Sequence, residues 1–103
     1  MDAVRPLREE HYAAVRRICE ICGIDHDLVT GRGQRSDVVL TRAMVFAYLH
    51  SRMSARWADL ERAFGRPRRA IMCSVRTLKG LITYHKEIRE QWTDLCEKME
   101  GAG

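Results

Sequence analysis

The sequence lacks the long hydrophobic runs and the dense turn residues that would indicate a membrane protein or an all-β fold. No stretch approaches the roughly 18 consecutive apolar residues of a membrane-spanning helix, and residues 1–12 contain no apolar signal-peptide core. The chain has only two prolines and seven glycines, fewer turn residues than an all-β domain of this size needs. We therefore expect a helical, cytoplasmic protein with no membrane contact.

The sequence signatures of common enzymes are also missing. There is no GxxxxGK(S/T) loop for nucleotide phosphates, no GxGxxG turn and no GxSxG motif. The Asp-His-Asp run at residues 25–27 lies in a connection between helices, and residues of these types are common in turns. His11, His50 and His85 are scattered along the sequence, and we expect each to be a surface or partly buried residue. Nothing positions a nucleophile, so we expect no enzymatic activity and no cofactor.

Cysteine is the residue type that comes nearest to a metal-ligand spacing. Cys19 and Cys22 form a CxxC pair, but Cys73 and Cys96 are too far apart to supply the second close pair that structural zinc sites usually have. Cys19 and Cys22 also fall on the apolar face of an expected helix. We interpret them as core thiols in a reducing compartment and expect no metal site.

The sequence does contain enough apolar residues for one hydrophobic core. Its 103 residues predict a single domain spanning residues 1–103, because a typical domain has about 150 residues. Apolar residues make up 46% of the chain and charged residues 31%. This balance is typical of a soluble globular protein and too apolar for a disordered one.

Positive charge is concentrated in the middle of the chain. Residues 32–79 hold eleven Lys and Arg and three acids, a formal charge of +8, whereas the two flanks together hold seven basic and eleven acidic residues, a charge of −4. Ten of the eleven are arginine, whose planar fork matches phosphates and guanine edges. This pattern favours an oriented nucleic-acid surface. The composition alone also fits a solvated face on which charges cluster by chance.

Apolar residues recur at helical spacing and predict a compact all-α bundle of about five helices. The first helix spans residues 6–22. The connection after it includes a flexible basic loop at residues 31–36. The second helix spans residues 37–52, with Ser36 or Asp37 as its expected N-cap. It has the widest apolar coverage, so we expect it to be central.

Two helices separated by Gly65 predict a helix-turn-helix over about residues 55–82. The first of them is short, at residues 55–63, and Ser54 is its expected N-cap. The second spans residues 67–82 and begins at a proline, whose missing N–H is not needed at a helix start.

A last helix over about residues 84–99 completes the predicted bundle. Gly80 either separates it from the preceding helix or only weakens one long helix. The helix is acidic, and Trp92, Leu95 and Met99 repeat along it at helical spacing. These side chains could dock on another protein or form a dimer, so a protein-interaction module is one alternative function.

Arginines crowd the start of the second helix of the predicted helix-turn-helix, at Arg66, Arg68 and Arg69. In this motif the second helix enters the major groove with its N-terminal residues facing base edges, and the free N–H groups at a helix start attract phosphates. Basic residues oppose the helix dipole at this end, so we expect an external anion to compensate them. Arg76 and Lys79 continue the same exposed side.

The order of these elements resembles the C-terminal DNA-binding domain (domain IV) of the bacterial replication initiator DnaA, a domain of the Trp-repressor-like helix-turn-helix group. The resemblance covers about residues 12–85. The family pattern has an early helix, a basic loop, a helix with an internal arginine, a short helix ending in Phe-Gly, and a signature helix. Here these segments read VRRICEICGIDHDLV, GRGQRS, DVVLTRAMVFAYLHSRMS, WADLERAFG and RPRRAIMCSVRTL.

The signature of that family is similar to Gly-Arg-Asp-His-Ser/Thr-Thr-Val. Gly65 and Arg66 match its Gly-Arg, Ile71 matches its apolar residue, and Arg76 matches the arginine that follows. Residues 67–70 read Pro-Arg-Arg-Ala where the family has the residues that read bases and phosphates, so arginines would make those contacts here. Because the family's ATPase domain is missing, the resemblance implies a stand-alone duplex-binding module, as in a phage or mobile element, and not origin melting.

The residues and the resemblance together predict sequence-selective binding of double-stranded DNA. The start of the recognition helix would face the major groove and its flank would hold phosphates. The basic loop would reach the adjacent backbone, or the minor groove as the resemblance implies for Arg32 or Arg35. A Trp-repressor-like transcriptional regulator is an alternative with the same DNA chemistry. The predicted DNA-binding residues are Arg32, Gln34, Arg35, Arg56, Arg66, Arg68, Arg69, Arg76 and Lys79.

Overall fold

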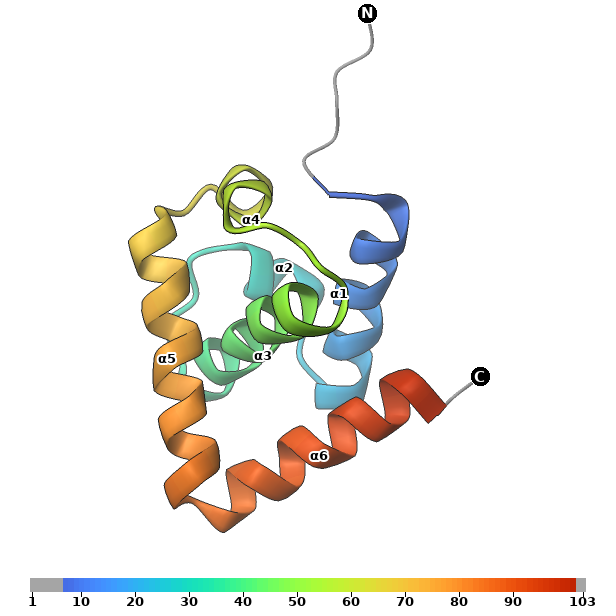
Figure 1. The fold of residues 1–103 in the computed structure, drawn as a ribbon, viewed down its shortest axis with the longest axis vertical. Coiled ribbons are helices and arrows are strands. Elements are labelled where there is room, and N and C mark those ends of the chain that lie inside the picture. The colour runs from blue at the N-terminus through green and yellow to red at the C-terminus, as the bar shows by residue number, and fades with distance from the viewer. Residues whose placement is uncertain (1–6, 102–103) are drawn as a thin grey trace, which may run out of the picture.

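Six α-helices and no strand form the part of the chain that the structure, a computed structural model, describes, residues 7–101 (Figure 1). The all-α class expected from the sequence is confirmed, with one short helix in the predicted connection. Within that range, no helix has the length and apolarity needed to cross a membrane. The predicted helix start at Pro6 lies outside the described residues. The helices are α1 (Glu9–Cys22), α2 (His26–Thr30), α3 (Ser36–Arg52), α4 (Trp57–Phe64), α5 (Arg68–Tyr84) and α6 (Lys86–Gly101).

Helix α3 passes through the middle of the bundle, and every residue from 41 to 49 is buried. Helices α1, α2 and α5 contact it from different sides (Figure 1). A helix that is apolar around most of its circumference needs neighbours on all those sides, and Met44, Phe46 and Leu49 give α3 this character. The prediction that this helix is central is confirmed.

Helix α5 packs its apolar stripe against α3 and α4. Ile71, Val75 and Leu78 are buried, and their i, i+4, i+7 spacing places them on one side of the helix. At the end of α4, Phe64 meets Phe46 edge to face, with ring centroids 5.0 Å apart. Helix α5 is therefore held along one side, and its opposite side faces solvent.

Gly80 lies inside α5 and not between two helices. Gly80 therefore does not separate two helices, and the second alternative, one long helix that the glycine only weakens, is the correct one. The chain turns at His85, and α6 then packs against α5 and α1 (Figure 1).

The apolar residues of α6 pack against the core of their own chain. Leu95 is buried, Met99 packs against the core, and Trp92 meets Tyr48 edge-on with ring centroids 6.5 Å apart. Leu95 is therefore unavailable for docking on another protein, whereas Trp92 and Met99 are only partly buried against the core, and the protein-interaction role stays a prediction.

Two helix starts differ from their predicted caps. Ser54 does not cap α4: it adopts a left-handed φ of 58°, and the following Ala55 N–H donates to the Leu49 carbonyl at 2.9 Å. This geometry closes the C-terminus of α3. At the start of α3 the N-cap residue is Arg35, whose side chain makes no cap hydrogen bond, and Ser36 and Asp37 are already helical. Asp37 Oδ1 still accepts the first-turn backbone N–H of Val38 at 2.8 Å.

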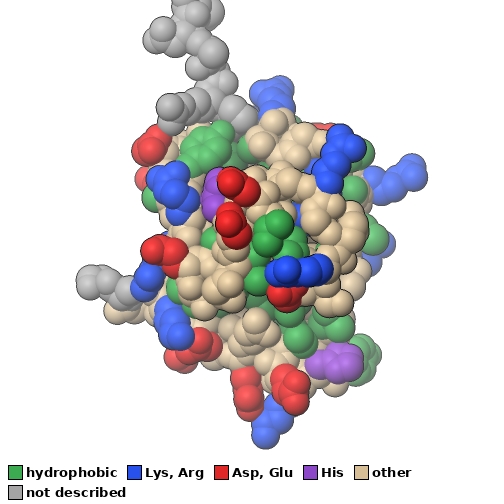
Figure 2. Space-filling view, turned by 180° about the vertical axis from the view of Figure 1, so that it is seen from behind, with side chains coloured by type: hydrophobic (Ala, Val, Ile, Leu, Met, Phe, Trp, Pro, Cys, Tyr) green, Lys and Arg blue, Asp and Glu red, His purple; other side chains and the backbone are tan. Residues whose placement is uncertain are grey.

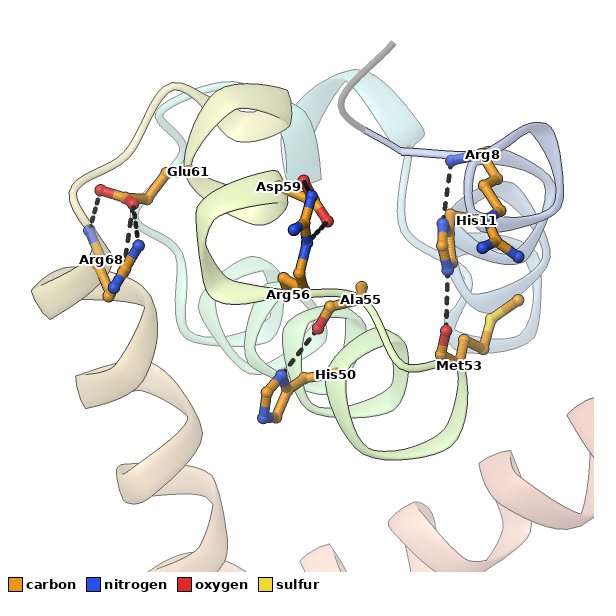
Figure 3. Close-up of polar contacts among 9 residues, drawn as sticks. All are labelled: Arg8, His11, His50, Met53, Ala55, Arg56, Asp59, Glu61 and Arg68. Atoms are coloured by element: carbon orange, nitrogen blue, oxygen red, sulfur yellow. Dashed lines mark hydrogen bonds and ion pairs between the residues drawn. The ribbon is translucent and has the colours of Figure 1, made fainter. Parts of the chain in front are cut away.

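Two histidines hold the connection between α3 and α4 (Figure 3). His11 is buried, which corrects its expected position at or near the surface. Its Nδ1 accepts the Arg8 backbone N–H at 3.0 Å, so Nε2 is the atom that donates to the Met53 carbonyl, also at 3.0 Å. The His50 ring stacks on Trp57 with centroids 3.7 Å apart. These contacts fix where α4 begins.

All four cysteines are free thiols, and they differ in burial. Cys19 and Cys96 are buried, Cys22 is half-buried and Cys73 is exposed. Burial raises the pKa of Cys19 to about 11, and the neighbouring Cys22 and Asp25 charges raise it further. The interpretation of Cys19 and Cys22 as core thiols agrees with this placement. Among residues 7–101 no group of three or more His, Cys, Asp and Glu side chains could hold a metal ion.

Candidate nucleic-acid interface

Three arginines of the predicted site follow the glycine that ends α4, in the turn between α4 and α5 and at the start of α5. Helix α4 ends at Gly65, whose φ of 61° and ψ of 36° lie in the left-handed region that glycine adopts without strain. Pro67 is extended, with φ −62° and ψ 146°, and α5 begins at the next residue. Arg66 therefore lies in the turn itself, and Arg68 and Arg69 lie in the first turn of α5.

The start of α5 has a carboxylate partner of its own, Glu61 of α4 (Figure 3). Glu61 Oε1 accepts the Arg68 backbone N–H at 3.0 Å, and Oε2 accepts Arg68 Nε–H at 3.3 Å. The carboxylate therefore caps the positive end of the helix and neutralises one arginine there. Glu61 therefore supplies, for Arg68, the compensation that was expected from an external anion, whereas Arg69 has no carboxylate partner among residues 7–101. The sequence pattern did not reveal the pair because its members lie on different helices, seven residues apart.

Arg66 is half-buried and is engaged within the protein. Its Nη2 donates a hydrogen bond to the carbonyl of Gly31, 35 residues earlier in the chain. Its Nε atom is buried and has no hydrogen-bond partner among the described residues. Arg66 therefore links the α4–α5 turn to the start of the basic loop.

Arg42 of α3 binds the same carbonyl and is only 4% exposed. Its Nε donates to the Val29 carbonyl at 2.8 Å, and its Nη2 donates to the carbonyls of Leu28 at 2.9 Å and Gly31 at 3.2 Å. These carbonyls lie at the C-terminal end of α2, where the helix dipole favours a cation. Burial, and then the charge of Arg66, lower the pKa of Arg42. Two guanidinium groups thus meet at one helix end.

The outward face of α5 carries cations that have no carboxylate partner in the described part of the chain. Arg69, Arg76 and Lys79 are exposed, and their i, i+7, i+10 spacing places them on one side of the helix. No carboxylate within residues 7–101 forms an ion pair with any of them. Met72 lies on the same side and is 37% exposed. This face therefore combines uncompensated positive charge with a small apolar patch.

The basic loop of residues 31–36 contributes one unpaired cation, the exposed Arg32. Arg35 instead holds Asp37 through two hydrogen bonds, from Nε to Oδ1 at 3.1 Å and from Nη2 to Oδ2 at 3.2 Å. Its guanidinium lowers the pKa of the Asp37 carboxyl. The Gln34 side chain donates to the Arg32 carbonyl at 3.3 Å. Only Arg32 of these three is a cation without a partner in the described chain.

Arg56 is also paired, and it lies away from the turn. Its Nε and Nη2 donate to the two carboxylate oxygens of Asp59 at 3.1 and 3.3 Å (Figure 3), which lowers the pKa of Asp59. Helix α4 has eight residues and is therefore about 12 Å long. Because Arg56 precedes the helix and the turn follows it, the structure does not bring Arg56 together with Arg66 and Arg69.

Arg62 of α4 is a candidate that the sequence interpretation missed. It is exposed and lines a shallow hollow at the turn together with Glu61 and residues 65–68. In the described part of the chain no carboxylate pairs with it. Arg62 is one of the eleven basic residues between positions 32 and 79. It was not predicted to bind DNA because in a helix-turn-helix most base contacts come from the second helix.

Charge is distributed unevenly over the molecule. On the face seen in Figure 2, basic side chains project at the edge where α5 lies, and acidic side chains predominate over α6. Helix α6 carries five acids and three basic residues, whereas α5 has no acid in its sequence. A polyanion would therefore be attracted to the α5 edge and repelled by α6.

The structure thus divides the nine predicted DNA-binding residues into groups. Carboxylates of the same chain bind three of them, a backbone carbonyl binds the fourth, and Gln34 is uncharged. The carboxylate-bound residues are Arg35, Arg56 and Arg68, the carbonyl-bound residue is Arg66, and the cations without a partner among residues 7–101 are Arg32, Arg69, Arg76 and Lys79.

Comparison with known proteins finds no protein-family model that matches the chain and no curated protein that is significantly similar to it.

Proposed function

We propose that this protein binds double-stranded DNA sequence-selectively, with α4 and α5 acting as a helix-turn-helix. The observation that carries the proposal is the outward face of α5, where Arg69, Arg76 and Lys79 project without a carboxylate partner in the described chain. Unpaired cations on one helix face suit a polyanion, because each phosphate that they neutralise releases condensed counterions.

The dimensions of α5 support its role as the recognition helix. Its 17 residues make a rod about 25 Å long, and the major groove, about 12 Å wide, admits an α-helix. In this orientation Arg69, near the N-terminus, reaches base edges and can bind guanine O6 and N7 bidentately. Arg76 and Lys79 bind phosphates along the flank, and Met72 offers an apolar contact for a thymine methyl group.

The remaining arginines extend the interface on both sides of α5. Arg32 in the basic loop reaches the adjacent backbone or the minor groove, and Arg62 contacts the backbone near the turn. Arg35 can exchange its carboxylate for a phosphate, since exposed ion pairs are worth only about 0–1 kcal/mol and the Arg35 and Asp37 side chains are 66% and 56% exposed. Arg56 is held more firmly, because its partner Asp59 is only 14% exposed.

The resemblance to DnaA domain IV agrees with this arrangement. The basic loop, the helix with an internal arginine, and the Gly-Arg pair at the turn occur in the family order, and Arg42 is that internal arginine. A module of this type would act in replication or its regulation. A transcriptional regulator would use the same surface and differ in where its sites lie.

Selection from a pool of random DNA duplexes tests the proposal. We expect a defined sequence motif to be enriched, and Arg69→Ala to relax the preference at one base pair, at a cost of about 1–3 kcal/mol. Arg16→Ala is the matched control, because Arg16 is an exposed arginine on α1 and should leave the motif unchanged. Failure of the wild-type protein to retain any duplex would contradict the proposal.

A further inference from the structure

We infer that Arg66 is a positioning residue, which holds the basic loop of residues 31–36 against the α4–α5 turn and does not itself contact DNA. The inference rests on the proposed function and changes the role that the sequence pattern assigned to this arginine. In this role Arg66 makes the basic loop and the recognition helix one rigid unit, joined at the carbonyl of Gly31.

The burial of Arg66 is the first observation behind this role. Its Nη2 is committed to the Gly31 carbonyl, and its Nε is inaccessible to solvent. Two of the three guanidinium nitrogens are therefore unavailable to a phosphate while the side chain keeps this position. Arg69, three residues further along, is exposed and needs no such rearrangement.

The position of the Gly31 carbonyl is fixed from two directions. Arg42 donates to it from the core at 3.2 Å, and Arg66 donates to it from the turn; a carbonyl oxygen has two lone pairs and can accept both. A Cβ on Gly31 would lie 2.8 Å from the backbone carbonyl oxygen of Asp27. The chain therefore requires glycine here, where the loop leaves α2.

The bond to Arg66 is the one side-chain hydrogen bond that joins the basic loop to the α4–α5 unit within residues 7–101. Without it, Arg32 would be displaced from its fixed distance to α5. The loop would then have to become ordered when DNA binds, which costs conformational entropy. In the wild-type protein the loop is already ordered before DNA binds. Arg66 thus acts on affinity through Arg32.

A double-mutant cycle with labelled duplex DNA separates positioning from direct contact. We expect Arg66→Ala to weaken binding by roughly tenfold in the wild-type background, and by less than about twofold when Arg32→Ala is already present. Arg66→Lys keeps the charge but loses the planar fork, and we expect it to weaken binding almost as much. Additive losses in the cycle, or full rescue by lysine, would mean that Arg66 contacts DNA as a simple cation, which would overturn the inference.

Limited trypsin digestion supplies a readout that needs no DNA. Trypsin cleaves after arginine, and both Arg32 and Arg35 are exposed in the loop. We expect severalfold faster cleavage at these two sites in Arg66→Ala than in the wild-type protein. Gly31→Ala, which leaves the charge of the protein unchanged, should be cleaved faster as well. Arg69→Ala should be cleaved at the wild-type rate. Circular dichroism verifies that each variant is folded, and Arg66→Lys replaces Arg66→Ala if the latter is not.

The two experiments distinguish the possible failures. Unchanged cleavage in both folded variants would show that Arg66 does not hold the loop and would overturn the inference, whatever the DNA result. Faster cleavage, combined with no DNA binding by the wild-type protein, would leave the structural link standing and refute the proposed function.

Discussion

The carboxylate of Glu61 and the backbone N–H of Arg68 lie 3.0 Å apart, so a side chain of α4 caps the start of α5. The same carboxylate binds the Arg68 guanidinium. This contact makes an arginine-rich helix start stable in the free protein and fixes the angle between the two helices. It also places a negative charge at the edge of the proposed DNA surface.

Replacing Glu61 with alanine is therefore expected to have opposite effects on stability and on binding. Loss of the cap should lower the free energy of unfolding by about 1 kcal/mol, measured by urea denaturation. DNA affinity should rise about threefold, because Arg68 is released and a repelling charge is removed. Glu97→Ala on α6, which removes one acid far from the turn, should leave the affinity unchanged. An affinity that falls in Glu61→Ala would show that Arg68 must be held by Glu61 to function.

Two glycines should respond to alanine substitution with opposite signs. Gly65 has a left-handed φ of 61°, so Gly65→Ala should destabilise the protein by about 1–2 kcal/mol through backbone strain alone, since no atom lies within 4 Å of the new Cβ. Gly80 lies inside α5 and its Cβ would also meet open space, so Gly80→Ala should stabilise by about 0.5–1 kcal/mol. Thermal denaturation of both variants measures the difference. Equal shifts would contradict the turn geometry.

Stability should fall as the solution becomes alkaline, because of the buried Cys19 thiol. Its pKa is about 11 in the folded protein against an ordinary value of 9.0. Above pH 9 the unfolded chain therefore releases this proton while the folded protein retains it, so the free energy of unfolding decreases between about pH 9 and pH 11. Urea denaturation across this range should show a shallower decline in Cys19→Ala than in wild type. The exposed Cys73 is the control, and Cys73→Ala should keep the wild-type slope.

Apolar periodicity was sufficient to predict the five longer helices but not the five-residue α2, and the central position of α3 followed from its wide apolar coverage. Gly65 marked the α4–α5 turn because few other residues adopt its conformation. These features depend on spacing within short segments. The ion pair between Arg56 and Asp59 also depends on local spacing, because the two residues are three positions apart, and it could have been predicted from the sequence.

The contacts that determine which cations are free depend on tertiary structure. Whether Arg66 faces DNA or Gly31 depends on how α2 and the turn approach each other across 35 residues, and no local pattern contains this information. Trp92 shows the same limit, since its helical spacing fits both a docking face and a core position until Tyr48 is placed beside it. Charge counting therefore located the basic region and overcounted its available cations.

The salt dependence of DNA affinity tests the central claim most directly, namely that the unpaired cations of α5 and the basic loop neutralise phosphates. With about five phosphates neutralised, log K for a labelled duplex should fall against log salt with a slope of about −4 to −5. Arg76→Ala and Lys79→Ala should each reduce the magnitude of the slope by about 1, and Arg16→Ala should not change it. A flat salt dependence, or equal slopes in all four proteins, would contradict the claim.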